Sequence, residues 1–422
     1  MVIKNYDKLA KTALRRDALT IVEAGYESID IEKLFTSKLH MEGDKLILGA
    51  NTYDLTKFKH IYVVGVGKGS GLAAKAIEKL LTPERITAGA IIDITTRRLK
   101  KIKSCKGTHP LPSEQNIAFT EEIIRIMELA DKDDLVISII CGGGSALFCK
   151  PGGLTCLELQ FISSVLLRAG ASIQEINTVR KHVSLIHGGY MAKYAYPATV
   201  LSLIISDVPG DQLEMVSSGP TVMDTTTKAD AERVAKQYGL PSIGMIETPK
   251  DAKYFKKVTN VLIASGSQTV EAMAIKARAL GYQPVVYSKR LSGLAKEVGP
   301  AMAARVKPGE ALLACGETEV IVTHPGMGGR NQDVVLSALT KLPDDAVIIS
   351  AASDGKDNVP VAGGIADGDW SRKQCAKLGI DPMAAVEENR GYKALHKLGD
   401  HLLINHITAN ISDFILVLRG KE

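Results

Sequence analysis

Short runs of Val, Ile and Leu alternate along the chain with stretches whose apolar residues recur at helical spacing. The runs are nearly continuous in their apolar character, and several end in Gly, Ser or Asp. They occupy residues 60–67, 88–94, 134–144, 198–208, 258–266, 283–288, 311–320, 346–355 and 413–420. Such strands between helices are typical of parallel sheets buried on both faces. The pattern predicts an α/β protein whose ligands bind beyond the carboxyl ends of the strands.

A polar, proline-bearing and aperiodic segment at residues 240–257 interrupts this alternation. A second series of strands and helices starts at Val258. We therefore expect two α/β domains with mainly parallel sheets, one covering residues 1–245 and the other residues 246–422. The pattern leaves open whether the last strand joins the second sheet or returns to the first.

Composition and charge restrict the class of protein. The 422 residues carry a net charge of +5, which does not indicate a nucleic-acid-binding protein. The densest basic run, 95–106, is predicted to be a solvated surface segment. Six cysteines without C-x-x-C spacing do not suggest a disulfide framework, and no apolar run is long enough for a membrane span. The first residues look helical rather than like a signal peptide, so we expect a cytoplasmic protein. We also expect a monomer or homodimer that acts on small molecules.

The stretch "VVGVGKGSGLAAKAIEKLL" at residues 63–81 places a glycine-rich turn between a strand and a helix. It matches neither the P-loop pattern G-x-x-x-x-G-K-[ST] nor the dinucleotide pattern G-x-G-x-x-G. Small residues at alternate positions would still let backbone amides approach an anion at the helix N-terminus. Lys68 would add a positive charge there, although a solvated lysine in a tight turn gives the same pattern.

A second glycine-rich turn, "SIICGGGSALF" at 138–148, also follows a strand. Consecutive glycines lower the stability of a folded chain through their conformational entropy, so they are rarely retained for packing alone. The turn predicts a phosphate or oxyanion cradle made by Gly142, Gly143, Gly144 and Ser145. Farther on, Thr155 and Glu158 have the spacing of a capping box.

Carboxylates follow two other strands. Asp207 and Asp211 lie in "IISDVPGDQLEMVSSGPT" at 204–221, and Asp354 lies in "SAASDGKDN" at 350–358. Carboxylate oxygens near phosphate-binding loops suit Mg²⁺, so these three residues are candidate metal ligands, although Asp211 could merely close a turn. Ser218 and Gly219 in the same segment could supply a hydroxyl and backbone donors to a nucleotide.

The segment "CGETEVIVTHPGMGGRNQDVVLSAL" at 315–339 presents Arg330, Asn331 and Gln332 at the start of a predicted helix. Arginine is a planar bidentate donor suited to a carboxylate or phosphate. Glu317, just beyond a strand, is a candidate neighbour of metal or nucleotide. His109, in "GTHPLPSEQN", follows a turn and could contact a substrate.

Glycine loops, a lysine, an arginine and carboxylates at strand ends suit phosphoryl transfer, which depends mainly on positioning and charge neutralisation. The order of "GVGKGS", "THPLPSEQN", "CGGGSALF", "SDVPGDQLEMVSSGPT", "CGETEVIV", "GMGGRNQ" and "SDGKDN" resembles that of class II glycerate kinases with a C-terminal MOFRL domain. The resemblance covers roughly residues 10–415. It implies ATP-dependent phosphorylation of D-glycerate, usually to 2-phosphoglycerate; the candidate carboxylates add Mg²⁺ or another divalent cation as the expected cofactor. It also implies a Rossmann-like N-terminal domain, a MOFRL domain and an active site in the cleft between them.

The resemblance and the chemistry together assign roles to these residues. The catalytic set is Lys68, Arg330 and Asp207; the substrate-binding set is Lys68, Arg330, Asn331, Gln332 and His109; the nucleotide-binding set is Gly142, Gly143, Gly144, Ser145, Ser218, Gly219 and Glu317; and the metal-binding set is Asp207, Asp211 and Asp354. Two loops depart from the family pattern. Asn358 stands where a glycine is usual, and "NHITANISD" keeps Asn410 and Asp413 without the usual glycines.

Two alternatives remain open from the residues. A hydroxypyruvate reductase would bind NAD(P)H in the first domain, but it needs an unbroken G-x-G-x-x-G and an acidic residue about 20 positions later. Only Glu84 and Asp93 lie near that position. A non-catalytic module that binds a nucleotide or a sugar acid would not need lysine, arginine and carboxylates together at strand ends.

Overall fold

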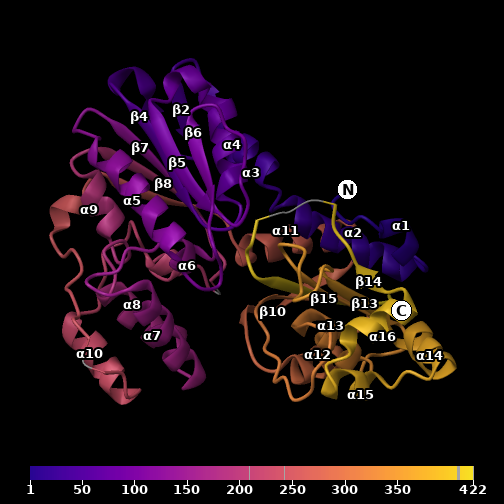
Figure 1. Ribbon diagram of the computed structural model, residues 1–422. Helices are drawn as coiled ribbons and strands as arrows, with labels where there is room; N and C mark the ends of the chain where they lie inside the picture. The colour runs from indigo at the N-terminus through magenta and orange to yellow at the C-terminus, as the bar shows by residue number, and fades with distance from the viewer. Residues whose placement is uncertain (209, 242, 406–408, 422) are drawn as a thin grey trace. The chain divides into compact units, whose positions relative to one another are not determined.

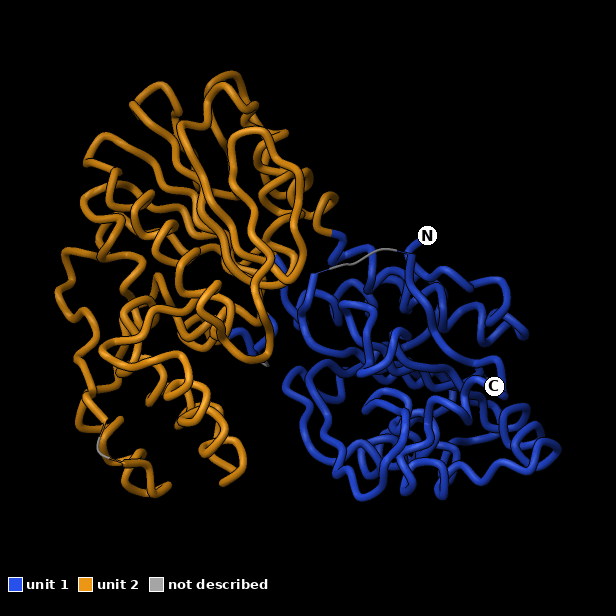
Figure 2. Tube along the Cα trace, viewed as in Figure 1, with its two compact units in different colours: residues 1–30, 207–211, 264–422 blue, residues 31–206, 212–263 orange. Residues whose placement is uncertain are grey.

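The computed structural model describes residues 1–208, 210–241, 243–405 and 409–421. Within it the chain forms two compact units (Figure 2). Unit 1 comprises Met1–Asp30, Asp207–Asp211 and Ala264–Glu422, and unit 2 comprises Ile31–Ser206 and Gln212–Ile263. The units therefore differ from a division at residue 245. The first 30 residues and Asp207–Asp211 belong with the C-terminal half, whereas residues 246–263, with the strand expected to open the second series, belong with the first sheet.

Unit 2 is built around a six-stranded sheet in the order β6-β5-β4-β7-β8-β9. Its strands are β4 (Ile61–Val66), β5 (Ala88–Asp93), β6 (Ile102–Lys106), β7 (Leu135–Ile140), β8 (Thr199–Ile205) and β9 (Val258–Ala264). The pairs β5/β6, β4/β5, β4/β7 and β7/β8 are parallel. In chain order the strands run 3-2-1-4-5-6, the order of doubly wound dinucleotide-binding folds. The order reverses between β4 and β7, so their carboxyl ends mark the expected ligand site.

Helices pack against this sheet, and Figure 1 shows their arrangement. Right-handed connections place α4 and α5 on opposite faces of the sheet, because the chain runs outward from β4 to β6 and then returns to β7. The helices of unit 2 are α3 (Ile31–Lys38), α4 (Ser70–Leu81), α5 (Glu114–Glu128), α6 (Gly144–Leu147), α7 (Cys156–Arg168), α8 (Ile173–His182), α9 (Tyr190–Ala195) and α10 (Lys228–Gln237). A separate antiparallel sheet consists of β1 (Leu39–Glu42), β2 (Lys45–Leu48) and β3 (Asn51–Asp54).

Unit 1 contains a mixed six-stranded sheet in the order β10-β11-β15-β12-β13-β14. Its strands are β10 (Gln283–Leu291), β11 (Glu310–Gly316), β12 (Ala346–Ala352), β13 (Gly363–Asp367), β14 (His401–Leu402) and β15 (Asp413–Arg419). The last strand thus lies in this sheet, antiparallel to both of its neighbours, β11 and β12. The pairings leave β10, β11, β12 and β14 running in one direction and β13 and β15 in the other.

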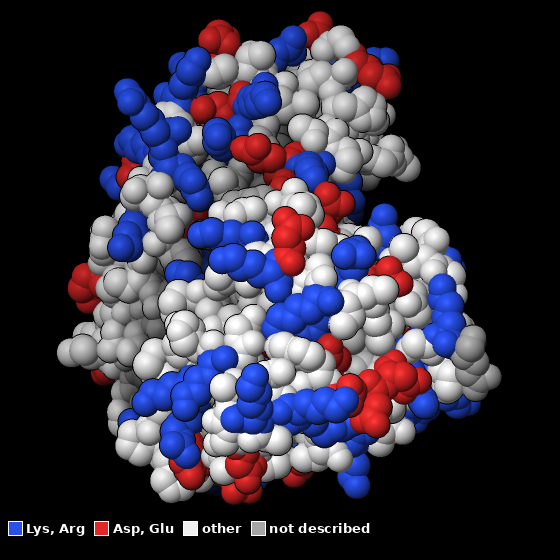
Figure 3. Space-filling view, turned by 90° about the vertical axis from the view of Figure 1, so that its right-hand side faces the viewer, with Lys and Arg blue, Asp and Glu red and all other residues white. Residues whose placement is uncertain are grey.

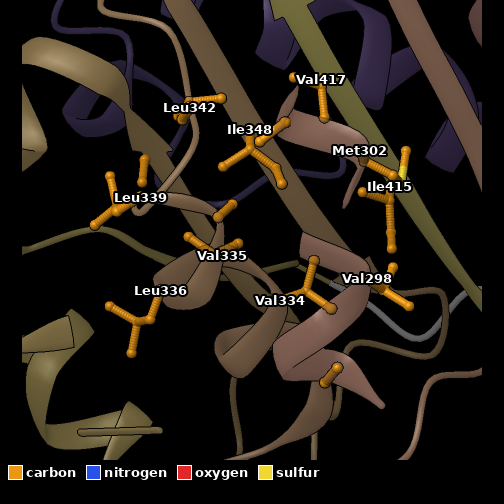
Figure 4. Close-up of a cluster of buried hydrophobic side chains, with 14 of the residues drawn as sticks. Val298, Met302, Val334, Val335, Leu336, Leu339, Leu342, Ile348, Ile415 and Val417 are labelled. Carbon is orange, nitrogen blue, oxygen red and sulfur yellow. The ribbon is translucent and has the colours of Figure 1, made fainter. Parts of the chain in front are cut away.

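The core of unit 1 lies between this sheet and two of its helices, α12 and α13. Side chains of α12, α13, β12 and β15 meet there, with Val298 and Met302 against Val334 and Ile415 (Figure 4). The helices of unit 1 are α1 (Tyr6–Leu9), α2 (Ala13–Glu27), α11 (Gly266–Ala279), α12 (Ala295–Arg305), α13 (Arg330–Ala338), α14 (Gly368–Leu378), α15 (Pro382–Glu387) and α16 (Gly391–Leu398).

Helix α2 belongs to unit 1 because of what its buried face contacts. Arg15, fully buried, bonds to Asp367 at 2.7 Å and to Asp400 at 2.8 Å. Tyr26 packs edge-on against Phe414 with ring centroids 4.8 Å apart, and its hydroxyl donates to the carbonyl of Ala352. These contacts join the start of the chain to strands near its end.

All nine predicted strands are confirmed, with ends that shift by a few residues, and so is the α/β class. The capping box of Thr155 and Glu158 is present. Sequence periodicity missed β1, β2, β3, β6, β13 and β14. Strand β6 lies inside the basic run that we expected to be a solvated surface segment; it is an edge strand, where lysines are common.

The distribution of charged side chains on the surface and the hydropathy of the helices can be compared with the sequence. Basic and acidic side chains are interspersed over the face in Figure 3, in keeping with the small net charge. None of the described helices combines the length and apolar character needed to cross a membrane.

Candidate active site

The turn that carries Lys68 is held against the turn after β7. Gly67 has φ of +103°, and a Cβ there would come within 2.2 Å of the carbonyl oxygen of Cys141. The amide of Lys68 donates to the carbonyl of Gly142 at 2.9 Å. The first and second glycine turns are thus joined at the point where the strand order reverses.

The N-terminus of α4 already has an acceptor. The carboxylate of Asp93, at the end of β5, accepts hydrogen bonds from the amides of Gly69 (3.2 Å) and Gly71 (3.1 Å). Asp93 is 2% exposed, and burial raises its pKa although these amides act in the opposite direction. The amides that we expected to face a ligand are therefore used within the fold, which leaves the Lys68 side chain as the turn's contribution to a site.

Gly143 brings Lys68 and His109 close to the second glycine turn. It has φ of +76°, and a Cβ there would come within 3.1 Å of His109 Nε2 and 3.4 Å of Lys68 Cε. Lys68 is partly exposed and His109 is exposed, so both can be reached from solvent. The structure thus brings two predicted substrate-binding residues together around one predicted nucleotide-binding residue.

Gly144 and its neighbours in this turn pack against the segment Val216–Ser218. Ser217 donates to the carbonyl of Cys141 at 2.7 Å, and Ser145 Oγ lies 2.8 Å from Ser218 Oγ. Ser217, Ser218 and Gly219 have φ of +49°, +57° and +62°. Left-handed backbone at two serines in succession costs about 1 kcal/mol or more for each residue, which marks this turn as strained.

In unit 1, Arg330 is the first residue of α13 and forms ion pairs with two carboxylates. Its Nε and Nη2 form a bidentate pair with Asp413 at 2.5 and 3.1 Å, and its Nη1 donates to Glu317 at 3.2 Å. The side chain of Arg330 is 32% exposed, whereas that of Asp413 is 4% exposed. Arg330 therefore has a fixed orientation and one accessible side.

Burial and charge act in opposite directions on this pair. Burial raises the pKa of Asp413 to about 7, although Arg330 lowers it. Burial lowers the pKa of Arg330, but the charge and hydrogen bonds of Asp413, together with the charges on Glu317 and Asp357, outweigh that effect and raise it above the ordinary value. The bidentate geometry favours an ionised carboxylate that holds a permanently charged guanidinium.

Asn331 and Gln332 follow Arg330 but are buried. The backbone amide and Nε2 of Gln332 donate to Asp357 Oδ2 at 3.1 and 3.0 Å. Asn331 accepts from Ser350 at 2.5 Å and lies 3.4 Å from Asp357 Oδ1. Asp357 thus caps α13 from the loop after β12, a contact that the sequence did not reveal, and the two predicted substrate-binding amides hold this cap.

The three candidate metal ligands all belong to unit 1. Ser412 donates to the backbone carbonyl of Asp207 at 2.6 Å, which places Asp207 beside the start of β15. Asp211 has φ of +59° and raises the pKa of Cys315 at the end of β11, second to burial. Asp354 accepts from the amide of Lys356 in a turn after β12. Within the described part of the chain, no three Asp, Glu, His or Cys side chains form a metal-binding group.

The predicted residues therefore fall into two sets. Unit 2 holds Lys68, His109, Gly142, Gly143, Gly144, Ser145, Ser218 and Gly219, and unit 1 holds Asp207, Asp211, Glu317, Arg330, Asn331, Gln332 and Asp354. Asp93 and Asp357 support these sets but were not predicted to do so. Each is an acidic residue at or beyond the end of a strand. In the sequence, that position is equally typical of a ligand-binding residue and of a helix cap.

Comparison with known proteins is consistent with this arrangement. Residues 17–247 match a family described as a domain of unknown function (DUF4147), and residues 310–413 match the MOFRL family. A glycerate 2-kinase of Pyrococcus horikoshii is 35% identical over 96% of this chain and 97% of its own. The crystal structure of a glycerate kinase from Thermotoga maritima has a TM-score of 0.82 at 30% identity and covers 96% of this chain and 99% of its own. A protein of Agrobacterium vitis with the provisional name hydroxypyruvate reductase is 34% identical over 85% of this chain and 87% of its own.

Proposed function

Since the chain belongs to the glycerate kinase family that carries a MOFRL domain, we propose that it phosphorylates D-glycerate with ATP and releases 2-phosphoglycerate and ADP. The observation that carries the proposal is the meeting of Lys68, His109 and the glycine turn at the switch point of a parallel sheet. Phosphate and carboxylate groups bind at such positions in α/β proteins. The partners of this reaction are small molecules.

Each set of residues has a role in this proposal. The turn Gly142–Ser145 binds nucleotide phosphates, while Lys68 and Arg330 neutralise the charge that develops on the transferring phosphoryl group. Asp207 orients the C2 hydroxyl and accepts its proton, while the hydroxyl oxygen bonds to the γ-phosphorus and the bond from phosphorus to the leaving ADP oxygen breaks.

The carboxylates also suit a divalent cation. Mg²⁺ in kinases is usually held by one or two carboxylates together with substrate phosphates and water, so a preformed group of three protein ligands is not required. Asp207 and Asp211 would hold it, with Asp354 as a further candidate. When bound, it would neutralise phosphate charge.

Phosphorus NMR tests the reaction directly. Incubation with ATP, Mg²⁺ and D-glycerate should give ADP and 2-phosphoglycerate in equal amounts. ADP without a phosphoglycerate would contradict the proposed acceptor, and 3-phosphoglycerate would contradict the proposed position.

Substitution of Lys68 tests the site. We expect Lys68→Ala to lower kcat/KM for glycerate by about a hundredfold, about 3 kcal/mol, because it removes a charge that acts in the transition state. Lys75→Ala, which removes an exposed lysine of the following helix, is the matched control and should retain full activity. If Lys68→Ala behaved like this control, the central role of Lys68 would be wrong.

The reductase alternative is supported by the strand order of unit 2, which dinucleotide-binding folds share. Against it, Asp93, the acidic residue at the end of the second strand, is buried against the N-terminus of α4, whereas a dinucleotide site needs such a residue to bind ribose. Absorbance at 340 nm with hydroxypyruvate and NADH separates the two activities, and we expect no change.

A further inference from the structure

Arg180, on helix α8, lies in a partly buried environment that offers it no negative charge. Its Nη1 donates to Asn177 Oδ1 at 3.2 Å. Burial lowers its pKa to about 10, and the one titratable group that acts in the opposite direction is the buried thiol of Cys149. Among the described residues, no carboxylate pairs with it. Since burial also raises the pKa of Cys149 to about 12, the thiol is neutral and Arg180 stays positively charged at neutral pH.

The two other arginines whose pKa values are shifted have a different environment. Arg15 faces the carboxylates of Asp367 and Asp400, and Arg330 faces those of Asp413 and Glu317. A cation that is even partly moved out of water without a carboxylate partner lowers the stability of a fold. Arg180 is therefore difficult to explain as a structural residue.

A chain of hydrogen bonds links Arg180 to the second glycine turn. Asn177 Oδ1 accepts from both Arg180 and Ser218, the latter at 2.7 Å. Ser218 Oγ in turn lies 2.8 Å from Ser145 Oγ. The guanidinium is thus connected through two side chains to the first residues of α6, and Arg180 is partly exposed to solvent.

The buried side chain of His187, on which the charge of Arg180 acts, also has few partners. His187 is 2% exposed, and among the described residues its ring nitrogens have no side-chain partner; the backbone of Phe148 is the one hydrogen-bonding group that acts on the ring. Burial lowers its pKa to about 3, and the charges on Arg180 and Lys181 act in the same direction. A buried ring with so few hydrogen-bonding partners, on which the charge of Arg180 acts, suits a region that a polar ligand completes.

We propose that Arg180 contributes the positive charge of an oxyanion-binding site next to Ser145 and Ser218, and that this oxyanion belongs to a substrate of the enzyme. The inference rests on the proposed kinase function. The oxyanion is either a phosphate of the nucleotide or the carboxylate of glycerate, because guanidinium recognises both through paired N–H donors.

Calorimetric titration of the full-length protein with ATP and, separately, with D-glycerate tests this proposal. We expect R180M to bind one of the two about ten- to a hundredfold more weakly, since it loses a charge-assisted hydrogen bond. Weaker ATP binding would assign the phosphate, and weaker glycerate binding would assign the carboxylate. R180K keeps the positive charge but loses the paired N–H donors of the guanidinium, so its affinity should fall between those of R180M and the wild type. Arg168→Met, at an exposed position in the same unit, is the matched control.

Thermal unfolding distinguishes a ligand-binding role from a structural one. Because R180M removes an unpaired, partly buried charge, its unliganded form should unfold at the same temperature as the wild type or higher. A lower unfolding temperature, or affinities within twofold of the wild type for both ligands, would overturn the proposal. Wild-type protein that bound neither ligand would contradict the kinase function as well, whereas tight wild-type binding unaffected by R180M would contradict this inference alone.

Discussion

Single residues of the candidate site are fixed by what surrounds them more than by their type. Gly143 is required because its backbone is left-handed and because Lys68 and His109 occupy the space where a side chain would begin. Asp93 and Asp357, which resemble ligand-binding carboxylates in the sequence, each accept backbone amides at the start of a helix. The same residue type thus has a different role according to the donors that reach it.

Gly143→Ala tests how closely the Lys68 side chain is positioned. The new Cβ would strain the left-handed backbone by about 1 kcal/mol and press on Lys68 and His109, so we expect kcat/KM to fall ten- to a hundredfold. Gly153 has φ of +86° and no atom within 4 Å of its Cβ position, so Gly153→Ala carries the same backbone strain without the contacts. Steady-state kinetics and urea unfolding should show similar stability for the two variants but lower activity only for Gly143→Ala.

Asp333 should make stability depend on pH. Burial, together with the charge on Asp357, raises its pKa to about 7, and its Oδ1 has no hydrogen-bond partner among the described residues. The folded state therefore binds a proton that the unfolded state has released above about pH 4, so this group stabilises the fold at low pH and that contribution is lost as the pH rises toward 7. Asp333→Asn should thus gain stability relative to the wild type by up to about 1 kcal/mol per pH unit between pH 5 and 7. A constant difference in urea unfolding over this range would contradict the raised pKa.

At the scale of elements, the helices of the site begin on acceptors supplied by neighbouring strands or loops. Asp93 caps α4 from the end of β5, and Asp357 caps α13 from the loop after β12. Each cap fixes the start of the helix beside which Lys68 or Arg330 lies. These contacts join segments more than 20 residues apart, so a local sequence pattern such as a capping box cannot reveal them.

Asp93→Ala should show how much such a cap contributes. It would leave two buried amides of α4 without an acceptor, and we expect the free energy of unfolding to fall by about 2 kcal/mol. Asp381 also accepts two amides, at the start of α15, but it is exposed. Water can replace that carboxylate, so Asp381→Ala should cost about 1 kcal/mol or less. Equal losses in chemical denaturation would show that burial does not strengthen the Asp93 cap.

At the scale of the whole molecule, the two ends of the chain belong to one unit. Helix α2 is joined to β13 and to the residue before β14 through Arg15, and to β15 through Tyr26. The segment Asp207–Asp211 belongs to this unit as well, although it directly follows the strand that ends at Ile205 in the other sheet. The candidate carboxylates Asp207 and Asp211 are thereby grouped with Arg330.

Arg15→Met tests this organisation. It leaves Asp367 buried without a cationic partner and Asp400 with Lys11 alone, which should lower the free energy of unfolding by about 3 kcal/mol. Hydrogen exchange measured by mass spectrometry should accelerate in the strands of unit 1 and stay unchanged in β4 and β7 of unit 2. Arg16→Met, at the exposed neighbouring position, should change neither. Acceleration in both units would contradict the assignment of the first 30 residues to unit 1.

The sequence by itself determined the α/β class, nine strands and the family, because continuous apolar runs and glycine turns are local signals that a buried parallel strand and its loop impose on the chain. It also placed Lys68 and the glycine turn of residues 142–144 at strand ends. It could not show that Asp93 and Asp357 cap helices, that Arg180 has no carboxylate partner among the described residues, or that α2 and β15 share a unit. Those features depend on which distant groups meet in the folded chain, and only the tertiary structure decides that, because hydrogen bonding and desolvation act between residues far apart in sequence.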